Sequence, residues 1–342
     1  MNSVQSRHMD DSILLAHGSG GKLSHELVEK RIVPFLANPA LNRLDDSAVF
    51  EASGRLAFTT DGYVVNPIFF PGGDIGKLAV CGTVNDLSMN GARPLCLSLA
   101  AIIEEGFRLS DLDRIVQSIK ETAQEADVSI ITGDTKVVDR GQADKLFITT
   151  SGVGIIPRGV DISGANARVG DKVLLSGTIG DHGIAIMSQR EGLKFSVTLK
   201  SDCAPLNKLV SQMLDASLRI HCLRDPTRGG LATTLNELAR QSNAGIAIEE
   251  NKIPIKEPVK AACELLGLDP IYVANEGKLV AVVDATDADN ILAAMKKNVY
   301  GRDAAIIGEV TDAHPGRVTM KTKFGPSRIV DMLSGELLPR IC

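Results

Sequence analysis

Aspartates recur at five places where the sequence leads us to expect the end of a strand or helix. They are found at Asp45 and Asp46, Asp61, Asp86, Asp134, and Asp225. A single aspartate at such a place is ordinarily a turn former or a helix N-cap. A divalent cation that holds nucleotide phosphates, however, requires several carboxylate oxygens converging from different elements. Five such places in one chain therefore favour metal-assisted phosphate chemistry.

Two of these aspartates have the most informative surroundings. Asp86 lies late in an otherwise apolar predicted helix, where an ionised carboxylate is unfavourable unless a metal or a partner meets it. Asp225 comes just before a predicted helix that begins near Gly229, and a helix N-terminus favours a bound anion. We therefore expect Asp86 and Asp225 to serve a metal ion.

A glycine-rich run, HGSGGK, extends from His17 to Lys22. Its successive backbone N–H groups and its single lysine are the ingredients of a phosphate cradle, although the spacing is not that of a Walker A motif. The alternative interpretation is a flexible linker, with His17 as an ordinary polar loop residue. The run alone does not decide between the two.

Lys136 and Glu276 are the candidates for proton chemistry and charge stabilisation. Lys136 follows the tripeptide Gly133-Asp134-Thr135, and Glu276 comes immediately before an expected strand, where it could also be an ordinary solvated turn acid. The six histidines show neither H-x-x-x-H spacing nor a Ser/His/Asp order. A zinc protease and an acyl-transfer triad are therefore not supported.

The chain ends in a thiol, at Cys342. The residues after Val330 show no helix or strand period and include Pro339, so we expect a flexible tail over residues 331–342. Eight extended residues reach about 25 Å, which lets the thiol travel between sites. The alternative is a frayed end that happens to stop at cysteine. A prenylation signal is excluded because the cysteine would need three residues after it.

The elements that must position these residues form two α/β halves. In the first half the periodicity predicts strands at 55–61, 95–103, 129–132 and 145–155, and helices at 74–90 and 109–126, the latter capped by Ser110 and Asp111. In the second half it predicts strands at 172–176, around 246, at 279–283 and at 306–310, with helices to about 189, at 207–216 and at 231–242. A polar, glycine-rich stretch at 157–166 is the expected linker. We predict domains at 1–157 and 158–330.

Length and composition agree with this division. A chain of 342 residues allows roughly two domains of ordinary size. Its net charge of -5 argues against a general nucleic-acid binder, and its six cysteines contain no C-x-x-C pair, which argues against a disulfide scaffold or a zinc site. The N-terminus has no apolar signal region, and the longest apolar stretch, 95–103, is too short to span a membrane. We expect a cytoplasmic protein.

Taken together, these motifs resemble the HypE family of carbamoyl dehydratases in NiFe-hydrogenase maturation, within the superfamily of aminoimidazole ribonucleotide synthetase and selenophosphate synthetase. The resemblance covers almost the whole chain, including the motifs at 17–22, 69–73, 133–138, 176–183, 225–230 and 274–278 and the terminal Pro-Arg-Ile-Cys. It implies a two-domain PurM-like α/β (α+β) architecture with mixed sheets flanked by helices. It also implies a homodimer joined through the N-terminal domains, with ATP and Mg2+ at the edge of that interface.

The resemblance further implies a role for each motif residue. Magnesium would be served by Asp46, Asp86 and Asp225, although the motif leaves open whether Asp45 or Asp46 is the ligand. The nucleotide would be bound by Lys22, Asp45, Asp61, Gly133, Asp134 and Thr135. The catalytic residues would be Cys342, Glu276 and Lys136, with the last two placed where the modified thiol meets the γ-phosphate.

In this family a HypF-type carbamoyltransferase would place a carbamoyl group on Cys342. ATP-dependent dehydration would convert that group to a thiocyanate, with Glu276 as the base and Lys136 as the alternative. A HypC–HypD-type iron scaffold would then receive cyanide. Two other functions stay open: a synthetase acting on a soluble amide or selenide, and a passive thiol carrier. Against selenide, the segment before Lys22 lacks a cysteine.

Overall fold

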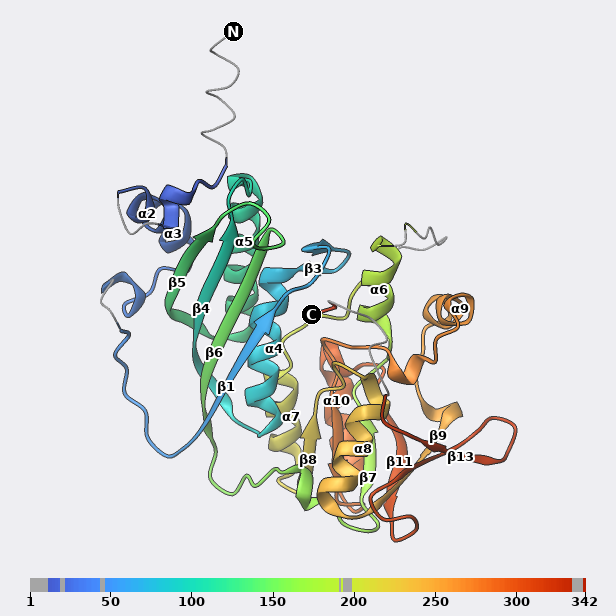
Figure 1. The fold of residues 1–342 in the computed structure, drawn as a ribbon. Helices are drawn as coiled ribbons and strands as arrows, with labels where there is room; N and C mark the ends of the chain where they lie inside the picture. The colour runs from blue at the N-terminus through green and yellow to red at the C-terminus, as the bar shows by residue number, and fades with distance from the viewer. Residues whose placement is uncertain (1–11, 19–21, 44–46, 191, 193–198, 334–340) are drawn as a thin grey trace.

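The computed structural model describes residues 12–18, 22–43, 47–190, 192, 199–333 and 341–342. Two separate sheets organise the chain, one of four strands and one of seven, beside a two-stranded ribbon. The sheets lie in the N-terminal and C-terminal halves, with helices between and beside them, and the C-terminus lies between the halves (Figure 1). None of the helices in the described ranges is long and apolar enough to cross a membrane.

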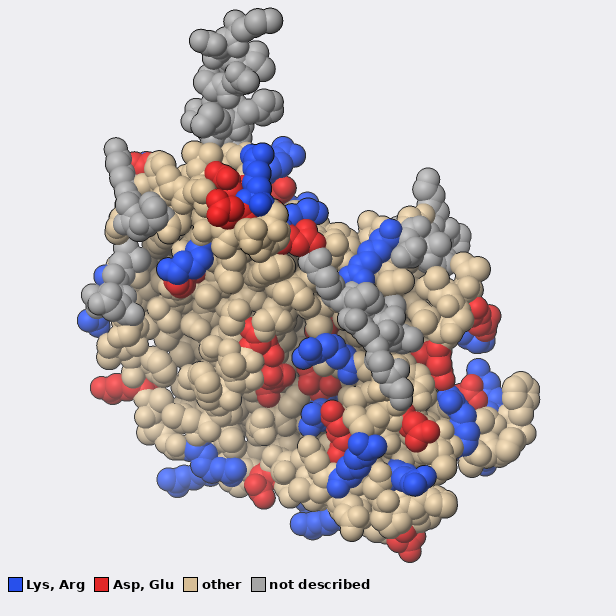
Figure 2. Space-filling model, in the orientation of Figure 1, with Lys and Arg blue, Asp and Glu red and all other residues tan. Residues whose placement is uncertain are grey.

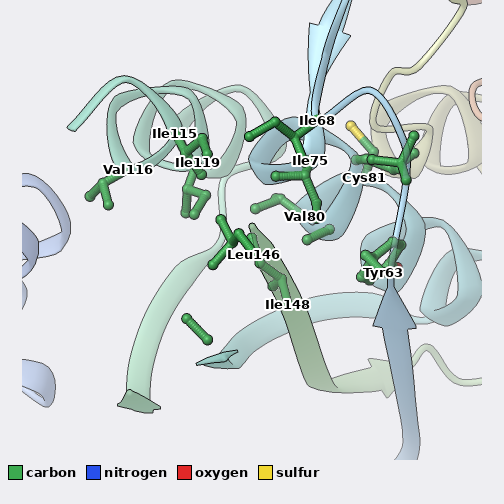
Figure 3. Close-up of a cluster of buried hydrophobic side chains, with 14 of the residues drawn as sticks. Tyr63, Ile68, Ile75, Val80, Cys81, Ile115, Val116, Ile119, Leu146 and Ile148 are labelled. Atoms are coloured by element: carbon green, nitrogen blue, oxygen red, sulfur yellow. The ribbon is translucent and has the colours of Figure 1, made fainter. Parts of the chain in front are cut away.

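The N-terminal sheet has the order β1-β6-β4-β5, in which only β4 and β5 run parallel. Helices α4 and α5 cover one face, and the apolar side chains of this face form a buried core (Figure 3). Asp74 begins α4 by accepting hydrogen bonds from the backbone N–H groups of Gly76 and Lys77. The elements are β1 (Arg55–Tyr63), α4 (Ile75–Met89), β4 (Arg93–Glu104), α5 (Leu109–Ala126), β5 (Ser129–Val138) and β6 (Leu146–Ile156).

The opposite face of this sheet carries exposed apolar side chains. Leu56 and Phe58 on β1 are 51% and 72% exposed, and Ile102 on β4 is 41% exposed. These residues alternate with inward-facing ones, as expected for strands with one covered face. Side chains of this size on one sheet face are typical of a surface that another protein covers.

The C-terminal sheet is mixed, with the order β13-β12-β9-β11-β7-β10-β8. Alternate side chains along its strands belong to two apolar layers, one shared with α8 and the other with α7 and α10. The strands are β7 (Lys172–Leu175), β8 (Ile220–Arg224), β9 (Gly245–Glu249), β10 (Val280–Val283), β11 (Ala305–Thr311), β12 (Val318–Lys321) and β13 (Ser327–Val330). The helices are α6 (Asp181–Arg190), α7 (Asn207–Ala216), α8 (Gly230–Ser242), α9 (Glu257–Leu266) and α10 (Ala288–Lys297).

Short elements complete the described chain. Before β1 lie a 3-10 turn, η1 (Leu15–Gly18), α2 (Lys22–Leu27), a π-helical turn, η2 (Val28–Ile32), α3 (Val33–Leu36) and η3 (Leu41–Arg43). The ribbon consists of β2 (Phe69–Phe70) and β3 (Gly73–Asp74). Four further 3-10 turns are η4 (Gly164–Asn166), η5 (Glu250–Lys252), η6 (Pro270–Tyr272) and η7 (Val299–Gly301).

The mixed α/β fold with helix-flanked sheets confirms the expected architecture, and two local predictions were wrong. Ser110 and Asp111 do not cap α5, because they lie within its first turn and the N-cap is Arg108 without a side-chain bond. Strand β5 does not end near Thr132 but continues to Val138. An edge strand tolerates such polar residues, since its alternate side chains can face solvent. Asp134 and Lys136 therefore lie within a strand.

Asn85 on α4 connects the two halves of the molecule. Its side-chain amide donates to the carbonyl oxygens of Ala204 at 3.1 Å and Glu276 at 3.4 Å, and its Oδ1 accepts from the N–H of Leu206 at 2.8 Å. The Asn85 side chain is 2% exposed, so these bonds are buried. A buried amide with all of these partners satisfied fixes α4 against the loops that precede α7 and β10.

Candidate functional site

A cavity of about 450 Å³ lies where α4, strand β1 and the start of α8 meet the end of the chain. Acidic and basic side chains gather between the two halves on the face drawn in Figure 2. Both halves of the molecule supply the walls of this cavity. The walls include the predicted site residues Asp61, Asp86, Asp225, Glu276 and Cys342. Tertiary folding thus brings together five residues that are distributed from β1 to the last position of the sequence.

Three carboxylates form the acidic side of the cavity. Asp86 accepts a hydrogen bond from the Thr59 hydroxyl at 2.8 Å, and Asp61 accepts one from Thr83 at 3.3 Å. Burial, followed by the negative charges of Asp225 and Asp61, raises the pKa of Asp86 to about 7. Burial likewise raises the pKa of Asp225 to about 6. The cluster therefore holds more negative charge than its surroundings compensate, which suits a bound cation.

The third expected metal ligand, Asp46, lies outside the described residues, as does Asp45. No group of three or more His, Cys, Asp or Glu side chains within the described ranges is arranged closely enough to hold a metal ion by itself. Asp86 and Asp225, predicted to serve a metal ion, line the same cavity. A metal ion held by these two carboxylates would need further oxygen donors.

The turn that carries Asp225 requires glycine. Gly229 and Gly230 have φ values of 78° and 60°, and a Cβ on Gly230 would lie 2.6 Å from the carbonyl oxygen of Ile271. The carbonyl of Pro226 accepts two bonds from Asn275, from its backbone N–H at 3.1 Å and its side-chain amide at 2.9 Å. This pairing fixes the Asp225 turn against the loop that carries Glu276.

Glu276 is a buried acid, with 4% of its surface exposed. Its Oε1 has no hydrogen-bond partner within the described structure. Burial, reinforced by the charges of Cys203, Asp225 and Asp202, raises its pKa well above the ordinary value of 4.5. The alternative that Glu276 is a solvated turn acid is therefore wrong, because the side chain is buried at a cavity wall and its Oε1 is unsatisfied among the residues described, which is unfavourable without a ligand.

The end of the chain is docked in the same cavity. The N–H of Val64 donates to a main-chain carboxylate oxygen of Cys342 at 3.2 Å, and the Ile341 side chain is 3% exposed within the N-terminal core cluster. Burial, with the negative charge of Glu276, raises the pKa of the Cys342 thiol to about 12, against the opposing effect of Arg228. The terminal thiol is thus held neutral. Of the expected tail, residues 334–340 lie outside the described structure.

Of the residues expected to bind the nucleotide, Asp61 lines the cavity of Cys342, whereas the Gly133-Asp134-Thr135 segment lines a different cavity, of about 470 Å³. Gly133, Asp134, Thr135 and Lys136 lie at its wall, together with His17 and the inner face of the sheet. Lys136 is exposed and pairs with Asp134 at 3.4 Å. Lys22 begins α2, and residues 19–21 of its glycine run lie outside the described residues.

Within one chain, Lys136 is therefore not placed beside Glu276 and Cys342. Strands β1 and β5 form opposite edges of the N-terminal sheet, and Asp61 lies on one while Lys136 lies on the other. Three strand spacings of about 4.8 Å separate these edges. Strand order decides this separation, and residue spacing along the chain does not reveal it.

Arg228 lines the cavity that holds Cys342, and its role was not anticipated from the sequence. It is the one Lys or Arg among the described residues of that wall, and its charge opposes the pKa rise of both Glu276 and Cys342. The signal was present, because Arg228 belongs to the same D-P-T-R-G-G motif as Asp225. Arg228 supplies positive charge at the place where Lys136 was expected.

Known proteins provide an independent comparison. Residues 44–156 match the family model "AIR synthase related protein, N-terminal domain", and residues 168–321 match its C-terminal domain. A carbamoyl dehydratase HypE from Azotobacter vinelandii is 55% identical over 332 residues, 97% of each chain. A crystal structure of hydrogenase maturation protein HypE in complex with ATP is 49% identical with a TM-score of 0.94, over 96% of this chain and 99% of that one. A HypE chain in a HypE–HypF complex is 50% identical with a TM-score of 0.80, over 92% of this chain and 100% of that one. The chain belongs to the HypE family of carbamoyl dehydratases.

Proposed function

We propose that this chain uses ATP to dehydrate an S-carbamoyl group on its own Cys342 to a thiocyanate. The observation that carries the proposal is the docking of the terminal thiol in a cavity with three aspartates and a buried glutamate whose Oε1 has no hydrogen-bond partner in the described part of the chain. A substrate attached to the last residue would thus reach an acid–base group and a cation-binding cluster at once. The family membership assigns the same reaction class.

The reaction proceeds in two steps. The carbamoyl oxygen attacks the γ-phosphorus of ATP, so that an O–P bond forms, ADP leaves and one N–H proton is released. The second N–H proton then passes to a base, the C–O bond breaks, phosphate leaves and S–C≡N remains. Glu276 suits the base, because burial makes its carboxylate more basic than an exposed one. Lys136 remains the alternative.

Asp86 and Asp225, with Asp46, would hold Mg2+, which neutralises phosphate charge when bound. The raised pKa values of Asp86 and Asp225 support this assignment, because a cation relieves their mutual repulsion. Arg228 adds the positive charge that stabilises the departing phosphate on the Cys342 side of the cavity. Asp61 and Lys22 complete the nucleotide contacts.

Lys136 reaches this chemistry in a homodimer. We propose that the exposed apolar face of the N-terminal sheet, with Leu56, Phe58 and Ile102, pairs with the same face of a second copy. Strand β5 of one copy would then lie near β1 of the other, and ATP would be held by Gly133, Asp134 and Thr135 of one copy together with Asp61 of the second copy. This arrangement explains why one chain carries the nucleotide residues in two cavities.

The partners follow from the chemistry of the thiol. A HypF-type carbamoyltransferase would load Cys342, and a HypC–HypD-type iron scaffold would accept cyanide. A thiol with a pKa near 12 is a poor nucleophile at neutral pH, so loading takes place with Cys342 outside the cavity. We place these exchanges in the cytoplasm. We keep the domain division at 1–157, 158–330 and 331–342, in which the last segment carries the thiol.

Intact-mass measurement tests the proposal. The protein carbamoylated on Cys342 should lose the mass of one water after Mg-ATP is added, and it should keep that mass without ATP. Retention of the carbamoyl group in the presence of Mg-ATP would favour the passive carrier. ATP hydrolysis that depends on an added soluble amide and persists in Cys342→Ser would favour a soluble substrate.

A further inference from the structure

His182 holds the carbonyl group of the penultimate residue. Its Nε2 lies 2.7 Å from the carbonyl oxygen of Ile341, and its imidazole is fully buried in the first turn of α6. A carbonyl oxygen only accepts hydrogen bonds, so Nε2 carries the proton and donates it. The bond therefore joins the C-terminal half of the molecule to the backbone next to the reactive thiol.

The other side of the imidazole is fixed as firmly. Nδ1 lies 2.8 Å from the Ser201 hydroxyl oxygen. In the neutral ring with its proton on Nε2, Nδ1 accepts a hydrogen bond from this hydroxyl group. Ser201 in turn accepts from the N–H of Cys203 at 3.0 Å and donates its own N–H to the Pro71 carbonyl at 2.8 Å. Phe70 packs edge-on against the ring at 5.5 Å. Ser201 and Phe70 thus hold the imidazole of His182 through contacts other than that with Ile341.

Docking of the chain end satisfies a buried donor. With Ile341 in place, both ring nitrogens of His182 have partners, and burial lowers the imidazole pKa, which favours the neutral ring that this arrangement needs. When Ile341 leaves, the Nε2 proton must exchange its carbonyl acceptor for water, and this exchange is unfavourable because an intramolecular hydrogen bond makes a net contribution to stability. The contact therefore favours the docked state over the released state.

We propose that His182, oriented by Ser201, is the positioning residue that recognises the Ile341 carbonyl and holds Cys342 in the cavity. This inference rests on the proposed function, in which the docked state dehydrates and the released state meets partners. His182 does not touch the reacting atoms. It acts through the backbone of Ile341 and sets how the chain divides its time between the two states.

The rate at which iodoacetamide alkylates Cys342 measures release directly. The other five cysteines are buried, and peptide mass spectrometry locates the label. His182→Leu, which removes the donor, should raise this rate about tenfold, whereas His182→Gln, which keeps an amide N–H, should restore a rate near that of the wild type. Ser201→Ala should give an intermediate increase and serves as the second variant if His182→Leu does not fold. An unchanged rate in the folded variants, or equal increases for Leu and Gln, would overturn the proposal.

A second readout separates positioning from general damage. In His182→Leu the dehydration of carbamoylated protein should slow, while carbamoylation of the thiol by the carbamoyltransferase should be at least as fast as in the wild type. Equal losses in both reactions would contradict the proposal. Alkylation requires neither ATP nor a carbamoyl group, so it tests His182 even if the dehydratase proposal fails. Conversely, the ATP-dependent loss of water from the carbamoylated wild-type protein tests the dehydratase proposal whether or not His182 has this role.

Discussion

The backbone N–H of Glu276 donates a hydrogen bond to the Asp202 carboxylate across 3.1 Å. The same carboxylate pairs with Lys278 at 3.2 Å, and both of these side chains are nearly inaccessible. Gly277 lies between Glu276 and Lys278 in the sequence, and a Cβ on Gly277 would come within 1.8 Å of the Asp202 carbonyl oxygen. Asp202 therefore fixes the backbone from which Glu276 enters the cavity, while Oε1 of Glu276 has no hydrogen-bond partner among the described residues.

Glu276→Gln should slow dehydration by about 100-fold or more, because a positioned general base contributes a factor of this size. ATP affinity should stay within a few-fold of the wild type, since the amide has nearly the same shape. Single-turnover mass spectrometry and calorimetry measure the two effects. Glu309→Gln, on the distant strand β11, is the matched control and should behave as wild type. If Glu276→Gln dehydrates the carbamoyl group at the wild-type rate, Glu276 is not the base.

The pH dependence of stability should reveal the buried acid. Because the pKa of Glu276 is higher in the folded than in the unfolded chain, the folded state binds the proton more tightly. This group therefore reduces stability as pH rises above the unfolded value of about 4.3, by at most about 1.4 kcal/mol per pH unit, until the folded pKa is passed. Without nucleotide, the melting temperature of Glu276→Gln minus that of the wild type should therefore become larger as the pH is raised from 4.5 to 8. A constant difference would contradict the raised pKa.

Asp86→Asn should have two opposite effects. It removes a crowded buried charge, so the protein without metal should melt at a higher temperature above pH 7, where the wild-type carboxyl is ionised. It also removes a proposed metal ligand, so Mg-ATP affinity should fall by about 10-fold to 100-fold, as for other charged contacts. Differential scanning calorimetry and titration calorimetry measure the two effects. Asp312→Asn, on an exposed turn, controls for net charge, and unchanged Mg-ATP affinity in Asp86→Asn would exclude Asp86 from the metal site.

A homodimer with composite sites predicts complementation between inactive chains. Lys136→Ala and Glu276→Gln should each be inactive alone. A heterodimer isolated through two different tags should regain about half of the wild-type rate per dimer, because one of its two symmetric sites is intact. If Lys136 acts within its own chain, both sites of the heterodimer are defective and no activity returns. Phe58→Glu, on the exposed sheet face, should yield monomers by light scattering.

The docked thiol should resist alkylation in a pH-dependent way. Burial beside Glu276 raises the pKa of Cys342 to about 12, so the thiolate fraction in the docked state is small below that pH. The alkylation rate should still be increasing at pH 10.5, whereas the peptide Pro-Arg-Ile-Cys should level off above its pKa of about 8.5. If the alkylation rate of the wild-type protein levels off at the same pH as that of the peptide, the thiol is not docked.

Local sequence patterns determined most of the elements. The apolar period of 3.6 predicted α5 and α7 with their observed bounds, because one face of each helix must be buried. The D-P-T-R-G-G turn predicted the start of α8 to within one residue, because its glycines adopt positive φ. Patterns failed where tertiary context overrides them, as in the extension of β5 through Gly133 and Asp134 to Val138.

The sequence by itself determined which residues are chemically capable: the aspartates, Lys136, Glu276 and a terminal thiol. Only the tertiary structure decided which of them meet. The order of the strands put Lys136 on the sheet edge opposite Asp61, and the packing of α4 against the C-terminal loops buried Glu276 beside Cys342. His182 illustrates the same point, since its contact with Ile341 spans 159 positions. Such proximities arise from the burial of apolar faces far apart in the chain, and no local residue pattern encodes them.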